Sequence, residues 1–174
     1  LIASKGSSTF SAITPMGRQH ENDREATAAD LKWLADPAEE PEPFGDGGTK
    51  MAWNTFNVVS IYPNGNPVMS DVNQRWVGDC CACAVIASMA YLYPRFVKHI
   101  IKDNMDKTYT VTMYDPKGKQ ISVGVGGDYF IGNSGDLGAL GGRNKEVTWA
   151  TILEKAMIKW NQIYQGSSNV GGIG

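Results

Sequence analysis

The apolar positions of the chain form two long stretches that predict helices. In the C-terminal stretch they share the spacing i, i+3, i+4, i+7, i+11 and i+14, which is typical of an amphipathic helix: Trp149, Ile152, Leu153, Ala156, Trp160 and Ile163. The other stretch, from Cys80 to Tyr93, is apolar except at Ser88. It predicts a helix over 80–92 that is apolar nearly all round and lies at the centre of the fold. It is too short to span a bilayer, so no transmembrane segment is expected.

Shorter patterns predict the remaining elements. Thr27 and Asp30 resemble a capping box, which predicts a short helix that ends at Pro37. Pro94 suits the first turn of a further helix, whose apolar face would hold Phe96, Val97, Ile100 and Ile101. The alternating stretch 108–114, the turn 115–118 and the returning stretch 119–125 predict a β-hairpin, and a glycine-rich loop follows over 124–142. The expected fold class is α+β.

The chain changes character near residue 50. Residues 1–26 are polar and lack periodicity, which predicts a loosely held arm, and Pro37–Pro43 resembles a solvated acidic connector. We therefore expect an N-terminal arm or pro-segment over 1–50 and a compact domain over 51–174. The chain begins at Leu1 and ends just after a Gly-Gly pair, which suits a processed fragment of a longer polypeptide. The compartment stays open, with a lean towards the bacterial cell envelope or secretion.

Composition narrows the class of protein. The chain has 174 residues, 42% of them hydrophobic and 20% charged, which is typical of a globular domain rather than a disordered or fibrous protein. The formal net charge is −2, so the chain has no strongly basic character and nucleic acid is not an expected partner. The three cysteines lie within four consecutive positions, where helical neighbours point apart, so they do not predict a disulfide framework.

Cys80 is the candidate nucleophile. Gly78 and Asp79 precede the apolar run, and Asp79 is a good N-cap residue, so Cys80 is expected in the first turn of a helix. The unpaired amides and the positive dipole end at that point favour a thiolate over a thiol. Gln74 lies in the preceding loop, from which its side-chain amide can donate to an oxyanion that forms beside the sulfur.

A base for this nucleophile is missing from the sequence pattern. A cysteine nucleophile needs a partner, usually a histidine, within hydrogen-bond reach. His99 lies 19 positions after Cys80 on the following helix, which runs away from the thiol, and His20 lies in the N-terminal arm. The chain thus offers a nucleophile and an oxyanion donor without a base.

Two motifs resemble the calpain family of papain-like cysteine proteases. Gln74-x-x-x-Gly78-Asp79-Cys80, followed by Ala84-x-Ile86-Ala87-Ser88, is similar to the active-site segment of that family. About 70 residues later, Trp149-Ala-Thr-Ile-Leu-Glu-Lys-Ala156 and the pair Gly171-Gly172 resemble the calpain Phe-Trp-x-x-Leu-Leu-Glu-Lys-Ala helix and its diglycine. The resemblance covers roughly residues 51–172.

The resemblance implies the nucleophile-bearing half of a papain-like protease, a mainly helical subdomain with a β-hairpin. It implies Cys80 as the nucleophile and Gln74 as the oxyanion donor of an endopeptidase that cleaves peptide substrates. The catalytic histidine and its asparagine would belong to a second subdomain, which follows this one or forms a separate chain. Gly171 and Gly172 would offer backbone groups to the substrate.

The same resemblance implies a calcium ion. The family's carboxylate nine positions before the cysteine corresponds to Asp71, and the glutamate of the last helix corresponds to Glu154. Carbonyl groups around Asn64–Asn66 would complete a shell of oxygen ligands. Two positions depart from the family pattern: Cys81 replaces a tryptophan beside the nucleophile, and Asn66 replaces a glycine of the calcium loop.

Two other interpretations stay open. A calpain-like domain without catalysis would serve as a binding or regulatory module. Cys80, Cys81 and Cys83 could instead form a zinc or redox site, although neighbouring helical cysteines cannot all face one tetrahedral ion and no fourth ligand is close in the sequence.

Overall fold

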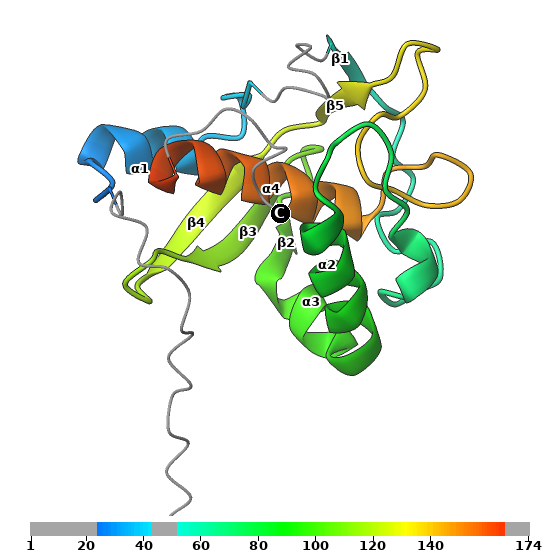
Figure 1. Ribbon diagram of the computed structural model, residues 1–174, viewed down its shortest axis with the longest axis horizontal. Helices are drawn as coiled ribbons and strands as arrows, with labels where there is room; N and C mark the ends of the chain where they lie inside the picture. The colour runs from blue at the N-terminus through cyan, green and yellow to red at the C-terminus, as the bar shows by residue number, and fades with distance from the viewer. Residues whose placement is uncertain (1–23, 43–51, 166–174) are drawn as a thin grey trace, which may run out of the picture.

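A computed structural model describes residues 24–42 and 52–165. In these residues the chain forms four α-helices and two small antiparallel sheets, which confirms the α+β class (Figure 1). The elements follow the order α1 (Ala28–Ala35), β1 (Ala52–Thr55), the 3-10 helix η2 (Met69–Asp71), α2 (Cys80–Leu92), α3 (Pro94–Ile100), β2 (Ile101–Asp103), β3 (Tyr109–Tyr114), β4 (Gln120–Val125), β5 (Asp128–Ile131) and α4 (Trp149–Tyr164).

Helix α4 is the centre of the fold. It lies across the β2–β3–β4 sheet, with α1 beside one end and α2 beside the other (Figure 1). The helix is confirmed at nearly the predicted residues, and Trp149, Ile152 and Ala156 of its apolar stripe are fully buried. Burial extends beyond that stripe, because the polar side chains of Glu154, Lys155 and Lys159 are also inaccessible to solvent.

The predicted β-hairpin is confirmed as β3 and β4. The Asp115 carboxylate accepts hydrogen bonds from the amides of Lys117 and Lys119, and Gly118 supplies the positive φ of 81° that closes the turn. Strand β2 adds to β3 as a third antiparallel strand, and β1 pairs with β5 in a separate two-stranded sheet. Neither pairing is visible in the local pattern of the sequence.

Helices α2 and α3 have almost the predicted bounds, but α2 is not at the centre of the fold. It buries only one side, formed by Ala82, Cys83, Ile86 and Ala90. Helix α3 ends one residue early, because Ile101 begins β2. Within the described residues no single helix is long and apolar enough to cross a membrane, and α2 with α3 reaches that length only across a bend of 112°.

The described part of the N-terminal segment, residues 24–42, packs against the domain. Leu34 of α1 is fully buried, and the buried ammonium group of Lys159 donates to the carbonyl of Asp36. Glu40 forms an ion pair with the buried Lys155, so the acidic stretch is not simply solvated as predicted. A side chain at Gly126 would place its Cβ 2.4 Å from the Pro37 carbonyl oxygen, which shows how closely this segment approaches the end of β4. His20, Met51, Gly171 and Gly172 lie outside the described residues.

Candidate active site around Cys80

Cys80 is the first residue of α2, as the sequence predicts, and its side chain is exposed. Cys81 is exposed as well, whereas Cys83 lies in the interior and donates its thiol hydrogen to the Asp79 carboxylate at 3.3 Å. Burial, followed by the charge of Asp79, raises the pKa of Cys83 far above its usual 9.0. The three cysteines therefore have different surroundings, and Cys83 is held as a thiol, which disfavours a shared zinc or redox site.

Asp79 occupies the N-cap position of α2 without capping the helix. Its carbonyl accepts the first hydrogen bond of the helix from the Cys83 amide at 3.0 Å. Its side chain accepts no hydrogen bond from the first turn, is only 1% exposed and faces the interior instead. The first-turn amides, which have no partner within a helix, are thus left free of the Asp79 carboxylate and available to a negative charge at Cys80.

Gln74 is exposed on the loop that leads into α2. One N–H of its side-chain amide donates to the carbonyl of Val77 at 3.0 Å, which holds the loop in a compact turn before the helix. A carboxamide nitrogen carries two hydrogens, so a second donor remains for an oxyanion. Gln74 and Cys80 are thus both exposed, the first on the loop and the second at the helix start that follows it.

The glycine-rich loop holds the Gln74 segment in place. The amides of Asn73 and Trp76 donate to the carbonyls of Gly141 at 2.9 Å and Gly138 at 3.0 Å. A side chain at Gly132 would place its Cβ 2.3 Å from the Trp76 indole nitrogen, so Trp76 would have to move to make room for it. The sequence predicts this loop but not its function as a support for the site.

A buried pair of carboxyl groups lies behind Cys80. Asp79 and Glu154 are each 1% exposed, and each side chain lies close enough to the other to shift its pKa. Burial and then the charge of Asp79 raise the pKa of Glu154 well above its usual 4.5, and burial raises the pKa of Asp79. Two buried carboxyls side by side cannot both be charged without a large free-energy cost, which favours one proton shared between them.

No histidine in the described residues is placed to act as a base for Cys80. Their one histidine, His99, is exposed in the last turn of α3. Helix α3 begins at the far end of α2, which has 13 residues and is about 20 Å long. The bend of 112° between the helices turns α3 back beside α2, so it does not run away from the thiol as predicted, but the length of α2 still separates His99 from Cys80.

Asp71, the first predicted calcium ligand, lines a polar depression whose other polar lining residues are Asn64, Ser70, Arg143, Asn144 and Glu146. The Asp71 carboxylate accepts hydrogen bonds from Asn64 and from the buried Trp149 indole. The Glu146 Oε2 atom is buried without a hydrogen-bond partner in the described residues. Carboxylate and amide oxygens are the ligands that calcium prefers, so these residues fit a calcium ion. Glu146 was missed by the sequence reasoning.

Glu154, the second predicted ligand, does not fit this ion. Its Oε2 atom accepts a hydrogen bond from the Leu140 amide, and burial followed by the charge of Asp79 raises the pKa of Glu154, which favours the neutral form, whereas a metal ligand must be ionised. The loop residue Asn66, which departs from the family's glycine, has an ordinary φ, because the positive φ of 76° belongs to Gly65. Lys98 donates to the Gly65 carbonyl at 2.7 Å, which takes up one of the predicted loop oxygens.

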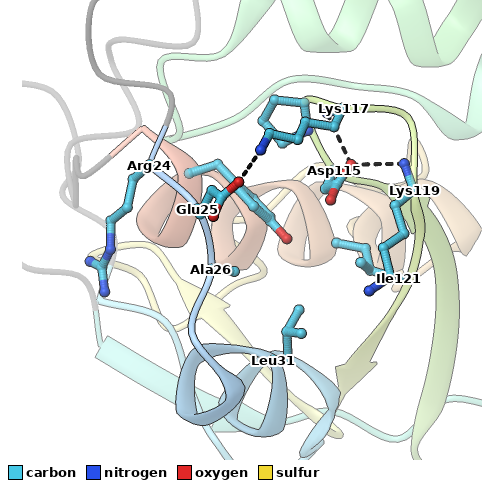
Figure 2. A pocket seen from close by; sticks show the side chains of 10 residues that line it. Arg24, Glu25, Ala26, Leu31, Asp115, Lys117, Lys119 and Ile121 are labelled. Atoms are coloured by element: carbon cyan, nitrogen blue, oxygen red, sulfur yellow. Dashed lines mark hydrogen bonds and ion pairs between the residues drawn. The ribbon is translucent and has the colours of Figure 1, made fainter.

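A separate pocket lies away from Cys80 and receives no residue from α2 or its preceding loop. Figure 2 shows it between the segment before α1 and the β3–β4 turn, with Leu31 and Ile121 at its apolar side. An ion pair between Glu25 and Lys117 crosses the pocket (Figure 2). The pocket shows how the N-terminal segment is held against the hairpin and does not contribute to the candidate active site.

No protein-family model matches the chain, and no significant relative is found among curated proteins. The resemblance to calpains thus depends on the two motifs, and membership of that family stays a prediction.

Proposed function

We propose that the chain is the nucleophile-bearing half of a papain-like, calpain-like cysteine endopeptidase. The observation that carries the proposal is the start of α2, where an exposed Cys80 meets first-turn amides that the N-cap side chain leaves open. An exposed amide donor, Gln74, lies on the loop that leads into α2, six positions before Cys80. A nucleophile at the positive end of a helix beside two kinds of N–H donor is the arrangement that acyl transfer requires.

The proposed reaction is hydrolysis of a peptide bond. The Cys80 thiolate attacks the carbonyl carbon, a sulfur–carbon bond forms, and the oxyanion accepts hydrogen bonds from the Cys80 amide and the Gln74 side chain. The carbon–nitrogen bond then breaks as a histidine of the second subdomain gives its proton to the leaving amine. The histidine next takes a proton from water, whose oxygen attacks the thioester and releases the acid and the thiolate.

The exposed side of α2 supports the existence of that second subdomain. Side chains on the surface of α2 and at the start of α3 form an apolar patch, and α2 itself contains no charged residue. Val85 is 57% exposed, Tyr91 74% and Leu92 59%. Several large exposed apolar side chains on one helix favour an interaction site, and this helix also carries the nucleophile. We assign this surface to the second subdomain that supplies the histidine and asparagine.

Calcium modulation is part of the proposal. Asp71 and Glu146 would hold the ion, which would supply positive charge between η2 and the turn before α4. Asp71 lies nine positions before Cys80, and the indole N–H of Trp149 holds its carboxylate in place for the ion.

Substitution of Cys80 tests this function, and Cys81 provides a matched control. Both thiols are exposed on the same helical turn, so loss of either changes local packing to a similar extent. In the complete enzyme, Cys80→Ala is expected to abolish peptide hydrolysis, whereas Cys81→Ala should keep activity within a few-fold. Site-mapped iodoacetamide labelling at mildly acidic pH should modify Cys80 first. Peptide hydrolysis that persists in the Cys80→Ala variant would contradict the proposal.

A non-catalytic binding module is the second candidate. It is favoured by the distance of the one described histidine from Cys80. Equal and slow labelling of Cys80 and Cys81 in the complete protein would support this candidate and count against the protease.

A further inference from the structure

Glu154 is a buried polar residue with two partners that belong to different segments. Its Oε2 atom accepts a hydrogen bond from the amide of Leu140 at 2.9 Å, and its carboxyl pairs with that of Asp79. It is 1% exposed at the middle of α4, where an unpaired carboxyl would be strongly unfavourable. A residue of this kind needs an explanation beyond the packing of the core.

The two partners lead directly to the two parts of the candidate site. Leu140 lies in the glycine-rich loop, between Gly138 and Gly141, whose carbonyls bind the segment that carries Gln74. Asp79 immediately precedes Cys80. The hydroxyl of Thr151, one turn before Glu154 on α4, donates to the Leu140 carbonyl and fixes the same loop from the other side.

The number of hydrogen-bond donors around the two carboxyls indicates that they share a proton. The Oε1 atom of Glu154 is buried and lacks a partner if both groups are counted as acceptors. A proton on Glu154 converts that atom into a donor to Asp79 and satisfies both groups. The pair therefore keeps the Asp79 carboxylate turned inward, away from the amides that an aspartate at an N-cap ordinarily binds.

We propose that Glu154 is a positioning residue for the reaction at Cys80. By binding Leu140 and Asp79 together, it fixes the helix start that carries the nucleophile relative to the loop that supports the oxyanion donor. It also keeps the Asp79 carboxylate off the first-turn amides, which stay open to the oxyanion. This inference depends on the proposed function and names a residue that the resemblance assigns to a different role.

Removal of the Glu154 side chain has a specific predicted effect. The Asp79 carboxylate would keep only the weak Cys83 thiol donor and would turn to cap α2, where it would occupy the amides needed by the oxyanion. Loss of oxyanion donors lowers kcat by about 10²–10³-fold while substrate binding is much less affected. We therefore expect Glu154→Ala to lower kcat of the complete enzyme by at least about 50-fold, with KM within about threefold.

The conservative variant separates positioning from simple stability. Glu154→Gln keeps an oxygen that accepts from Leu140 and gains an N–H that donates to Asp79, so kcat should stay within about threefold of the native enzyme. The double variant Glu154→Ala with Asp79→Ala should be faster than Glu154→Ala alone, because no carboxylate is left to occupy the amides. A merely structural role predicts further loss in the double variant. Ile158→Ala, which opens a cavity one turn further along α4, is the control for destabilisation and should leave kcat unchanged below its melting temperature.

Two outcomes would overturn the inference: a Glu154→Gln enzyme as slow as Glu154→Ala, or a double variant slower than Glu154→Ala. If Glu154→Ala does not fold, Asp79→Ala alone tests the same point, since iodoacetamide should then label Cys80 within about threefold of the native rate. A loss of tenfold or more would contradict it.

The labelling rates also separate this inference from the proposed function, because alkylation requires no peptidase activity. Suppose that no peptide is cleaved, but that Cys80 is labelled fastest in the native protein, more slowly in Glu154→Gln and slowest in Glu154→Ala. The protease proposal then fails and the positioning effect stands. If peptides are cleaved but Glu154→Ala equals the native enzyme, the inference fails alone.

Discussion

The indole N–H of Trp149 donates to the Oδ2 atom of Asp71 at 2.7 Å, and both side chains are almost completely buried. Trp149 is the first residue of α4, and Asp71 is the last residue of η2. The hydroxyl of Thr148 donates to the Asp71 carbonyl at 3.1 Å and strengthens the same connection. The start of the central helix thus fixes the segment that leads to the nucleophile.

Trp149→Phe should lower the free energy of unfolding by about 2–4 kcal/mol. The change removes ring volume from the core and leaves a buried carboxylate without one of its donors, which together account for the loss. Urea denaturation monitored by circular dichroism measures it. Trp160→Phe is the matched control, because its indole N–H bonds to the Tyr114 carbonyl at the surface and should cost less than about 1.5 kcal/mol. Equal losses in the two variants would contradict the importance of the Asp71 contact.

Calcium should stabilise the protein through Asp71 and Glu146. At a calcium concentration ten times the dissociation constant, binding to the folded state alone adds about 1.4 kcal/mol, which is visible as a rise in Tm. Asp71→Asn and Glu146→Gln should each abolish that rise, whereas magnesium should produce a smaller one because it prefers stricter octahedral geometry.

The control for the calcium experiment is Asp136→Asn, which removes an exposed carboxylate of the glycine-rich loop that pairs with Lys145. This variant should retain the full calcium response. A rise that persists in Glu146→Gln would show that the depression beside Asp71 is not the site.

Local signals in the sequence predicted the fold where one segment contains all the necessary information. The capping box at Thr27, the helical spacing after Trp149 and the turn residues before Gly118 each specify an element within a few positions. The pairing of β1 with β5 could not be predicted, because Ala52 and its partner Ile131 lie far apart in the chain.

The candidate site was predictable to the same degree and for the same reason. Cys80 and Gln74 belong to one short motif, so the exposure of both follows from local chemistry. The pairing of Asp79 with Glu154 depends on how α2 packs beside α4, and no local pattern indicates that two carboxyls will meet. The expectation that α2 lies at the centre of the fold was wrong, because apolar residues on a helix can form an exposed surface as well as a buried core face.

Lys159 should make the free energy of unfolding depend on pH in the alkaline range. Burial lowers the pKa of Lys159 to about 8, against 10.5 for an exposed lysine. Between these pH values the unfolded chain keeps a proton that the folded protein has released, so the free energy of unfolding rises with pH, by about 3 kcal/mol at most from this group. Raised pKa values of Cys83 and Tyr129 act in the opposite direction, so the informative quantity is the difference between the native protein and Lys159→Met.

The measurement is urea denaturation of both proteins between pH 7.5 and pH 10.5, a window chosen to span the two pKa values. The native protein should gain stability relative to Lys159→Met as pH rises. Lys102→Met, which removes an exposed ammonium group from β2, is the control for loss of one charge. A difference that stays constant across the window would contradict the assignment to Lys159.

The contacts of Lys155 and Lys159 also limit how such a protease could mature. Their ammonium groups bind Glu40 and the Asp36 carbonyl, and both lie in the interior beneath residues 24–42. An activating cut that released this stretch would remove both of these partners and would expose the apolar surface that now buries Leu34. If the chain is the protease proposed above, residues 24–42 are therefore expected to stay in place during any activating cut, as an integral part of the domain rather than a removable inhibitor.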